Sequence, residues 1–569
     1  MSAVVRSAVR PGAYYDSVVL MRLQRALAGL PGVLDAGAVM ATAANLEILA
    51  ANGLAPENLS EAGAHDLLIA VRAESSPAAV EALARVDALL EVRRSGGDED
   101  YRPRSLAAAG KQLPEAGWVL VSIPGHHAAA VADEALDQGR NVFLYSDNVP
   151  LAEEVALKQK ARERGLLVLG PDCGTASIGT IGLGFANHVR RGPIGLIGAS
   201  GTGLQAVMSR IHDLGSGISH AIGTGGRDLS REVGGTTALQ ALDLLRRDPE
   251  TRVLVLISKP PAPEVAVRLL DLARAAGKPV VVQLLGAPLP ARRLANLCFA
   301  ASLTEAAELA VRLADNPPRE EPLGAPIPAG RPYLRGLFSG GTLAFEALLG
   351  LSAVLAPVYS NISSNIPLNE SQRLPDPLRS QGHTVLDLGA DEFTVGRLHP
   401  MIDPDLRLRR LRQEAADPEV GLILLDVVLG EGAHADPAGE LVPAVEAIRA
   451  AGGPEIAAVV IGTDLDPQGL KLQVETLERA GVRVCRDVGA LVDLAVRRLP
   501  PGSVPLEGAP VPLSALQSPA AAINVGLETF YDSLRAQGAA AVQAVQIDWR
   551  PPAGGNEKLA GILARMRSR

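Results

Sequence analysis

The residues with the clearest capacity for chemistry lie in a small-residue turn between an apolar strand and a helix. The strand covers Ile194–Ile197, the turn reads Gly-Ala-Ser-Gly-Thr-Gly from residue 198, and the helix follows from about Leu204 to His212. Glycines let a backbone approach an anion closely, and the N–H groups and dipole of a helix N-terminus favour negative charge there. We therefore predict a phosphate-binding site at Ser200, Gly201 and Thr202.

The same pattern returns further along the chain, after the strand that ends at Phe338. Its repetition indicates two related α/β domains, each with a phosphate-sized pocket. The loop at 223–228 is also rich in backbone donors. The alternative is that these are ordinary strand-to-helix turns, because short glycine-rich turns are common and unspecific. The further residues predicted to bind phosphate or substrate are Gly225, Gly226, Ser339, Gly340, Gly341, Thr342 and Asn361.

Composition favours layered α/β domains and excludes several classes of protein. Of the 569 residues, 47% are hydrophobic but only 3% are aromatic, so the cores consist mostly of Ala, Val, Leu and Ile. Such cores suit parallel strands that are covered on both faces. The net charge is −9, with both signs interspersed, and no apolar run approaches the ~20 residues of a membrane span. We expect a cytoplasmic protein that binds neither nucleic acid nor membrane.

Alternating strand and helix patterns divide the chain into five regions. Residues 1–105 read β-α-β-α-β-α, which is typical of a small ferredoxin-like α+β domain with an accessory role. Residues 106–190, 191–328 and 329–503 each read as parallel α/β layers. Residues 504–569 are too few to fold alone, so we expect them to dock on the body of the chain or on a partner subunit.

Three predicted strands within 106–190 end in Gly, Pro or small polar residues. Ligands of open parallel sheets bind at the carboxyl ends of the strands, so these ends form a candidate pocket. The alternative is that all loops are rich in such residues. We expect no metal site, since the adjacent His126 and His127 point in different directions and the three cysteines are widely spaced. The candidate pocket residues are Pro124, Asn148, Pro150, Pro171, Asp172 and Cys173.

A polar segment, Asp391–Asp403, combines acids with Arg397 and His399 and lacks a clear helix or strand period. Polar residues concentrated in a loop favour function over core packing. The alternative is a solvated surface loop. We take Arg397 and His399 as the candidate catalytic residues.

Residues 112–310 resemble the α subunit of succinyl-CoA synthetase in three short motifs. Gly-Pro-Asp-Cys at 170–173 is similar to that family's G-P-N-C, and Gly-Ala-Ser-Gly-Thr at 198–202 to its phosphate-binding S-R-S-G-T. The loop at 223–228 is similar to its G-I-G-G-D loop. The resemblance implies a CoA pocket at the candidate strand ends, with CoA as a candidate ligand.

Residues 330–500 look more distantly like the ligase domain of the β subunit of the same enzymes. Together, the two resemblances imply a CoA-binding-like Rossmann domain at 106–190. They also imply two flavodoxin-like ligase domains, at 191–328 and 329–503.

Over its full length the chain resembles the FdrA family, which are fused relatives of those synthetases. The segments Asp391–Asp403 and Trp549–Asn556 carry the more specific part of this resemblance. It implies a component of a multi-subunit carbamoyltransferase that moves a carbamoyl group between an oxamate-type or ureido substrate and phosphate, giving carbamoyl phosphate. Co-encoded subunits would be its partners. Arg397 or His399 would polarise the carbamoyl oxygen or carry a proton.

One departure from succinyl-CoA synthetase bears on activity. Those enzymes relay phosphate through a histidine shortly after the last strand of the first ligase domain, but residues 286–298 contain none, and the next histidine is His383. There is also no region of ATP-grasp size. An NDP-forming acyl-CoA synthetase would need His383 or His399 as its relay. A non-catalytic scaffold that binds CoA or another metabolite for partner subunits is the third hypothesis.

Overall fold

The computed structural model divides into two compact units, Met1–Pro150 with Ala520–Arg569, and Leu151–Pro519. Within the described residues, no helix combines the length and the apolar character that a membrane span requires. The structure describes residues 3–10, 17–54, 66–91, 102–179, 181–287, 289–317, 323–324, 326–355, 357–362, 372–501, 507–517 and 521–550.

The N-terminal region forms an antiparallel three-stranded sheet with β3 (Leu67–Ala73) between β1 (Val4–Arg10) and β2 (Val33–Met40). β3 is apolar almost throughout because both of its faces are covered. Its odd-numbered residues pack on helices α1, α3 and α4, whereas Leu68 and Ala70 pack beside α2. This is the predicted α+β domain. Its helices are α1 (Ser17–Ala28), α2 (Ala43–Ala51), α3 (Ser76–Ala84) and α4 (Val86–Glu91).

A parallel sheet in the same unit joins the two ends of the chain. β21 (Ala521–Gly526) pairs with β4 (Trp118–Ser122), so the C-terminal region docks on this chain's own body. The strands of this sheet that belong to this unit follow the order β22-β21-β4-β5. The remaining elements are β5 (Asn141–Leu144), β22 (Gln543–Ile547), α5 (Leu106–Gln112), α6 (Gly125–Asp137) and α19 (Glu528–Ala536).

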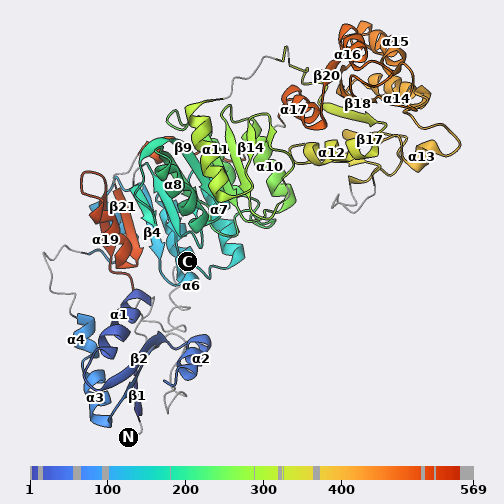
Figure 1. The fold of residues 1–569 in the computed structure, drawn as a ribbon. Coiled ribbons are helices and arrows are strands. Elements are labelled where there is room, and N and C mark those ends of the chain that lie inside the picture. The colour runs from blue at the N-terminus through green and yellow to red at the C-terminus, as the bar shows by residue number, and fades with distance from the viewer. Residues whose placement is uncertain are drawn as a thin grey trace. The chain divides into compact units, whose positions relative to one another are not determined.

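The second unit contains an eight-stranded sheet in the order β13-β14-β12-β11-β9-β10-β7-β8. Its central strands are parallel, while β7, β8 and β13 pair antiparallel at the edges. Helices α8 and α11 pack together against one face (Figure 1). Helices α9 and α10 pack on each other. The strands are β6 (Val168–Leu169, outside this sheet), β7 (Thr175–Ile178), β8 (Ile181–Gly184), β9 (Arg191–Gly198), β10 (Ile218–Gly223), β11 (Val253–Ser258), β12 (Val280–Leu284), β13 (Arg293–Leu294) and β14 (Leu297–Phe299). The helices are α7 (Leu151–Arg164), α8 (Gly201–Asp213), α9 (Thr236–Arg247), α10 (Pro263–Arg274) and α11 (Leu303–Asp315).

The last sheet is fully parallel, in the order β16-β17-β15-β18-β19-β20. α12 packs on α17, while α14, α15 and α16 pack in a row. β18 (Val420–Val428) is buried from its first residue to Val427, as expected for a strand covered on both faces. The other strands are β15 (Tyr333–Phe338), β16 (Val358–Ser360), β17 (His383–Asp387), β19 (Glu455–Ile461) and β20 (Arg483–Cys485). The helices are α12 (Gly341–Ser352), α13 (Asp391–Thr394), α14 (Asp405–Ala415), α15 (Pro437–Ala450), α16 (Leu470–Arg479), α17 (Val488–Arg498) and α18 (Ser514–Gln517).

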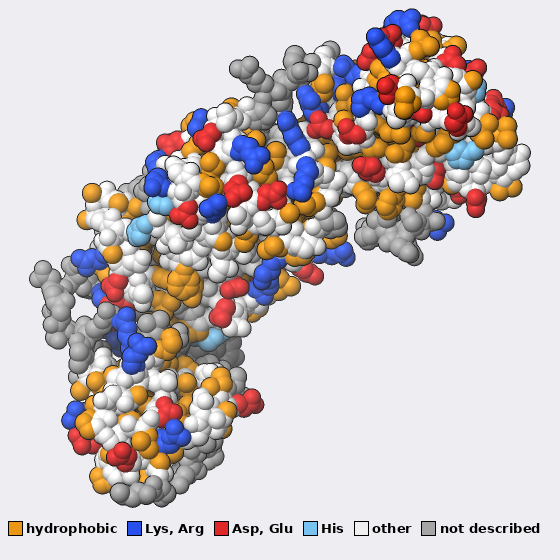
Figure 2. Space-filling view, in the orientation of Figure 1, with side chains coloured by type: hydrophobic (Ala, Val, Ile, Leu, Met, Phe, Trp, Pro, Cys, Tyr) orange, Lys and Arg blue, Asp and Glu red, His pale blue; other side chains and the backbone are white. Residues whose placement is uncertain are grey.

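These sheets confirm the predicted fold class of several parallel-sheet α/β domains with a small N-terminal α+β domain. Figure 2 shows acidic and basic side chains mixed over the face it draws, so neither sign of charge dominates that face.

Candidate functional site

The first predicted turn leads from β9 into α8, and Ser200 is the residue that caps this helix. Its Oγ accepts a hydrogen bond from the N–H of Gly203 at 3.2 Å. Amides in the first turn of a helix have no intrahelical acceptor, so the N–H groups of Gly201 and Thr202 remain available to an anion. Thr202 is exposed and Gly201 is half-buried, which leaves this helix end accessible from solvent.

At the carboxyl edge of the sheet, the loop at 171–175 lies beside the N-terminus of α8 and also beside the loop at 225–226. A Cβ placed on Gly201 would lie 3.3 Å from Thr175 Oγ1. A Cβ on Gly225, whose φ is +88°, would overlap the carbonyl oxygen of Pro171, and one on Gly226 would lie 3.3 Å from Asp172 Oδ2. At Gly225 only glycine fits, because of both this backbone contact and the positive φ. The structure thus brings the predicted pocket residues at 171–173 together with the predicted phosphate-binding loop at 225–226.

A buried ion cluster beneath this loop holds it in place. Lys158 Nζ donates to Asp228 Oδ1 at 2.8 Å and to the carbonyl oxygen of Thr224 at 3.0 Å, and it pairs with Glu154 Oε1 at 3.0 Å. Asp228 also accepts the N–H groups at the start of α9. Sequence reasoning missed this cluster, because Glu154 and Lys158 have the i,i+4 spacing of an ordinary surface pair on a helix.

Cys173 lies in the same region but is unsuited to nucleophilic chemistry. Its side chain is buried, and burial raises the pKa of the thiol to about 12. The thiolate, which is the nucleophilic form of cysteine, is therefore disfavoured at neutral pH.

The remaining predicted pocket residues lie in the other unit. Pro124 is the N-cap of α6, and a Cβ on the following Gly125 would lie 2.6 Å from the carbonyl carbon of Asn148. Pro124 and Asn148 are thus neighbours, and Pro150 follows directly in the same loop. Asn148 has a φ of 54°. The rings of His126 and His127 are 4.0 Å apart and tilted by 49°.

The second predicted turn, at the start of α12, already has an anionic partner from within the chain. Asp426 Oδ1 accepts hydrogen bonds from the N–H and the Oγ of Ser339, both at 2.8 Å, and Oδ2 accepts the N–H of Gly340 at 2.7 Å. A Cβ on Gly341 would lie 2.6 Å from Asp387 Oδ2. Two carboxylates thus occupy the helix end where we predicted phosphate, and Thr342 is exposed beside them.

Arg407, a residue that sequence reasoning missed, balances this charge. Its Nη1 donates to Asp426 Oδ1 at 2.9 Å and to the Asp426 carbonyl oxygen at 2.6 Å. Both side chains are buried. Arg397, which we predicted instead, is exposed, and its guanidinium makes no hydrogen bond or ion pair with the described residues.

His399 lies beside Asp387 at this edge. A Cβ on Gly389 would lie 2.7 Å from His399 Nε2 and 3.2 Å from Asp387 Oδ1, so the two side chains flank this glycine. Burial raises the pKa of Asp387, and the charges of Asp426 and Glu392 add to this effect. A carboxyl group with a raised pKa, beside a histidine, can exchange a proton with a substrate.

Asn361, one of the predicted binding residues, orients both Asp387 and Glu392. Asn361 Oδ1 accepts the N–H of Asp387 at 2.9 Å, and Nδ2 donates to Glu392 Oε1 at 2.6 Å. Sequence reasoning missed Asp387; the signal that could have found it is an acid directly after the apolar pair Val385 and Leu386.

His383, the other candidate relay residue, begins β17 and therefore lies at the opposite edge of the sheet from Asp387. Its Nδ1 accepts the N–H of Leu334 at 3.2 Å. Burial lowers the pKa of His383 to about 4, with help from the charges of Arg335 and Arg274. A neutral, hydrogen-bonded histidine at the amino end of a strand is poorly placed to carry phosphate to the site.

The lowered pKa of His383 predicts acid sensitivity. Because the folded state disfavours the proton, its contribution to stability is complete above the ordinary pKa of 6.5 and is lost as the pH falls toward 4. His383→Gln keeps an acceptor for Leu334 and removes the titration. Between pH 7 and 5 we expect wild type to lose about 2 kcal/mol more stability than this variant. Urea unfolding, monitored by limited proteolysis, measures the difference. Equal losses of stability in wild type and in the variant would contradict the prediction. Equal responses between pH 7 and 8 are the internal control.

Family models show which class of protein this chain resembles, that of the CoA ligases. A CoA-ligase family model matches residues 337–496, and a CoA binding domain model matches 189–285. The latter falls on the region that the resemblance assigned to the first ligase domain. A third model, "AllF, heavy metal-associated domain", matches 1–104, a stretch that contains no cysteine.

The particular family follows from whole-chain similarity. The chain is 43% identical over 494 residues to "Uncharacterized protein YahF" of Escherichia coli (strain K12), covering 84% of this chain and 95% of that protein. It belongs to the same family, a fused succinyl-CoA-synthetase-like family. The predicted relationship to these synthetases is confirmed, and membership of FdrA in particular stays a prediction.

Relatives that are named as CoA ligases each match less than a third of the chain. The α subunit 2 of an ADP-forming succinate–CoA ligase from Archaeoglobus fulgidus is 28% identical over 180 residues, which are 31% of this chain and 61% of that subunit. The α subunit of malate–CoA ligase from Methylorubrum extorquens is 31% identical over 174 residues, 29% of this chain and 57% of that subunit. The chain thus spans about three fifths of each ligase subunit.

Proposed function

We propose that this chain transfers an acyl-type group to or from phosphate, through a mixed anhydride bound at the N-terminus of α8. The observation that carries the proposal is that the loop at 171–175 packs beside Gly201, at the accessible N-terminus of α8, and also beside the glycines at 225 and 226. Backbone N–H groups at a helix N-terminus bind phosphate and stabilise the charge that develops on a reacting carbonyl group. The glycines at 225 and 226 let the backbone of the second loop approach the same anion.

CoA is the first candidate acceptor of the acyl group. The relatives with known activity are CoA ligases, and the family models that match are those of CoA-binding and CoA-ligase domains. In this version of the proposal the protein is an acyl-CoA synthetase, and it needs a phosphate relay. His399, beside Asp387 at the carboxyl edge of its sheet, is a better candidate for the relay than the enclosed His383.

Carbamoyl transfer is the second candidate, and the absence of histidine from 286–298 favours it. Moving a carbamoyl group between an oxamate-type substrate and phosphate needs a phosphate site and stabilisation of an oxyanion, but no phosphohistidine. Asp387 and His399 would exchange the proton. The exposed Arg397 would have to meet the substrate from the surface. In both versions, co-encoded subunits complete the enzyme.

A paired assay of the full chain with its co-encoded partners separates the candidates. One reaction contains ATP, CoA and a panel of small acids, and ADP is measured. The other contains carbamoyl phosphate with oxamate and other small amide acceptors, and phosphate is measured. ADP formation in the first reaction alone identifies an acyl-CoA synthetase, and phosphate release in the second alone identifies a carbamoyltransferase. Ligand binding without turnover in either would contradict the proposal and favour a metabolite-binding scaffold.

A further inference from the structure

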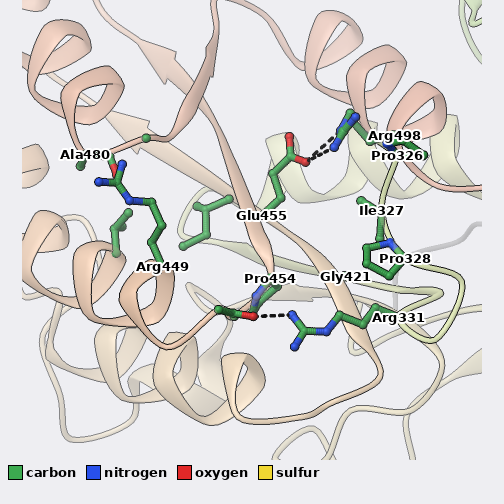
Figure 3. A pocket seen from close by; sticks show the side chains of 15 residues that line it. Pro326, Ile327, Pro328, Arg331, Gly421, Arg449, Pro454, Glu455, Ala480 and Arg498 are labelled. Atoms are coloured by element: carbon green, nitrogen blue, oxygen red, sulfur yellow. Dashed lines mark hydrogen bonds and ion pairs between the residues drawn. The ribbon is translucent and has the colours of Figure 1, made fainter. Parts of the chain in front are cut away.

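A pocket of about 530 Å³ lies at the amino ends of β18 and β19, at the opposite edge of their sheet from Asp426. Gly421 and Glu455, at the beginnings of these strands, line it. So do the segment 326–328 that precedes β15 and the turn 452–454 that follows α15 (Figure 3). Its volume falls in the range of pockets that hold small molecules. Because it lies at the opposite edge of the sheet from Asp426, the pocket is separate from the chemistry proposed above.

The charged groups of this pocket are three guanidinium groups and one carboxylate. The carboxylate, on Glu455, is already neutralised, because Arg498 Nη2 lies 2.7 Å from Glu455 Oε2 and Arg483 pairs with Oε1. Arg331 and Arg449 have no acidic partner among the described residues. Arg331 Nη1 donates to the carbonyl oxygen of Gly452 at 2.8 Å, and Arg449 Nη1 donates to that of Ala480 at 3.0 Å.

These two bonds have an ordinary structural explanation, which accounts for only part of the arrangement. The carbonyl groups of Gly452 and Ala480 lie at the C-terminal ends of α15 and α16, where arginine side chains commonly cap helices. Such an end carries only about half a negative charge. A guanidinium carries a full positive charge and five N–H donors, of which each cap uses one. The pocket therefore keeps an excess of positive charge and several oriented donors.

We propose that this pocket binds a small polyanion with a carbon body, whose carboxylate or phosphate groups pair with Arg331 and Arg449. Figure 3 shows Arg449 on one side of the pocket and Arg331 with Arg498 on the other, so a ligand with two separated anionic groups fits better than a single ion. Guanidinium groups match such groups with paired hydrogen bonds. The apolar side chains of Ile327 and Ile456 line the space for the carbon body.

Calorimetric titration of the full chain with citrate, which has three carboxylates on a carbon body, tests the site. We expect saturable binding of one citrate that weakens at least about 10-fold in Arg331→Gln and in Arg449→Gln, as expected for the loss of a charged hydrogen bond. Arg479→Gln is the matched control. It removes an exposed arginine from the end of α16 that does not line the pocket, and it should bind citrate as wild type does. No binding, or equal weakening in the control, would overturn the proposal.

Three further comparisons keep the test decisive if a variant unfolds. In wild type, citrate should slow hydrogen exchange of the amides at 449–456, and unchanged exchange there would contradict the site. Ser200→Asp, which closes the anion site of α8, should bind citrate normally; loss of binding in this variant would place the citrate at α8 instead. Inorganic phosphate should bind at least about 10-fold more weakly than citrate, because it can engage one arginine at a time. Equal binding would contradict the requirement for two anionic groups.

Discussion

Ser200→Asp is expected to abolish phosphate-dependent turnover while leaving the fold intact. Aspartate is as good an N-cap residue as serine, so the bond to the N–H of Gly203 persists and α8 still forms. The new carboxylate, however, stands where the phosphate must bind. Two like unit charges 4 Å apart repel by about 4 kcal/mol at an effective dielectric constant of 20. We expect phosphate-dependent turnover to fall at least about 100-fold, measured in whichever of the paired assays is active.

Ser302→Asp is the matched control for this prediction. Ser302 caps α11 in the same way, its Oγ accepting the N–H of Glu305 at 3.1 Å, and it is not part of the predicted site. Turnover in this variant should equal that of wild type. Full activity of Ser200→Asp, with its fold verified by circular dichroism, would remove the N-terminus of α8 from the mechanism.

Asp426→Ala should destabilise the domain that contains β15 and β18 by about 3–5 kcal/mol. The carboxylate is fully buried and accepts hydrogen bonds from two amides, a hydroxyl group and a guanidinium group. Its removal leaves Arg407 as a buried charge whose only acceptors are neutral oxygens, and it leaves the Ser339 and Gly340 amides unsatisfied. Hydrogen exchange of the β15 and β18 amides measures the loss, since their slowest exchange reports the stability of the domain.

Asp464→Ala provides the comparison, because Asp464 is exposed in the loop after β19 of the same sheet. Its effect should stay within about 0.5 kcal/mol. Asp426→Asn keeps the size of the side chain and loses its charge, so we expect an intermediate loss. A loss below about 1 kcal/mol in Asp426→Ala would mean that water replaces the carboxylate, and that the start of α12 remains open to an external anion.

The local structure around the candidate site could be predicted where its parts are close along the chain, and could not where they are distant in sequence. The run from Ile194 through Ser200 to the following helix contains the strand, the cap and the amides within some twenty residues, and the structure shows each of them. The second turn also leads from a strand into a helix N-terminus, although its N-cap residue is Gly340, which has no side chain to cap the helix. Its electrostatic environment differs because Asp426, 87 residues from Ser339, fills it. Sequence reasoning also missed Arg407, because its partner Asp426 lies in a different element and nothing local distinguishes Arg407 from the other arginines of α14.

The amino-acid sequence by itself determined the class of fold and the places where strands end in helix N-termini. Apolar runs, helical periodicity and capping residues act within a few residues of one another, so they can be read along the chain. Only the tertiary structure decided which of these ends is open to an anion. It also decided that Lys158 is buried beneath the loop at 223–228. It further decided that β21 pairs with β4, although the bonded residues Ser122 and Val525 are 403 positions apart in the chain. The partner of a buried charge or of a strand edge depends on the order of strands in a sheet, and that order is set by packing between distant segments.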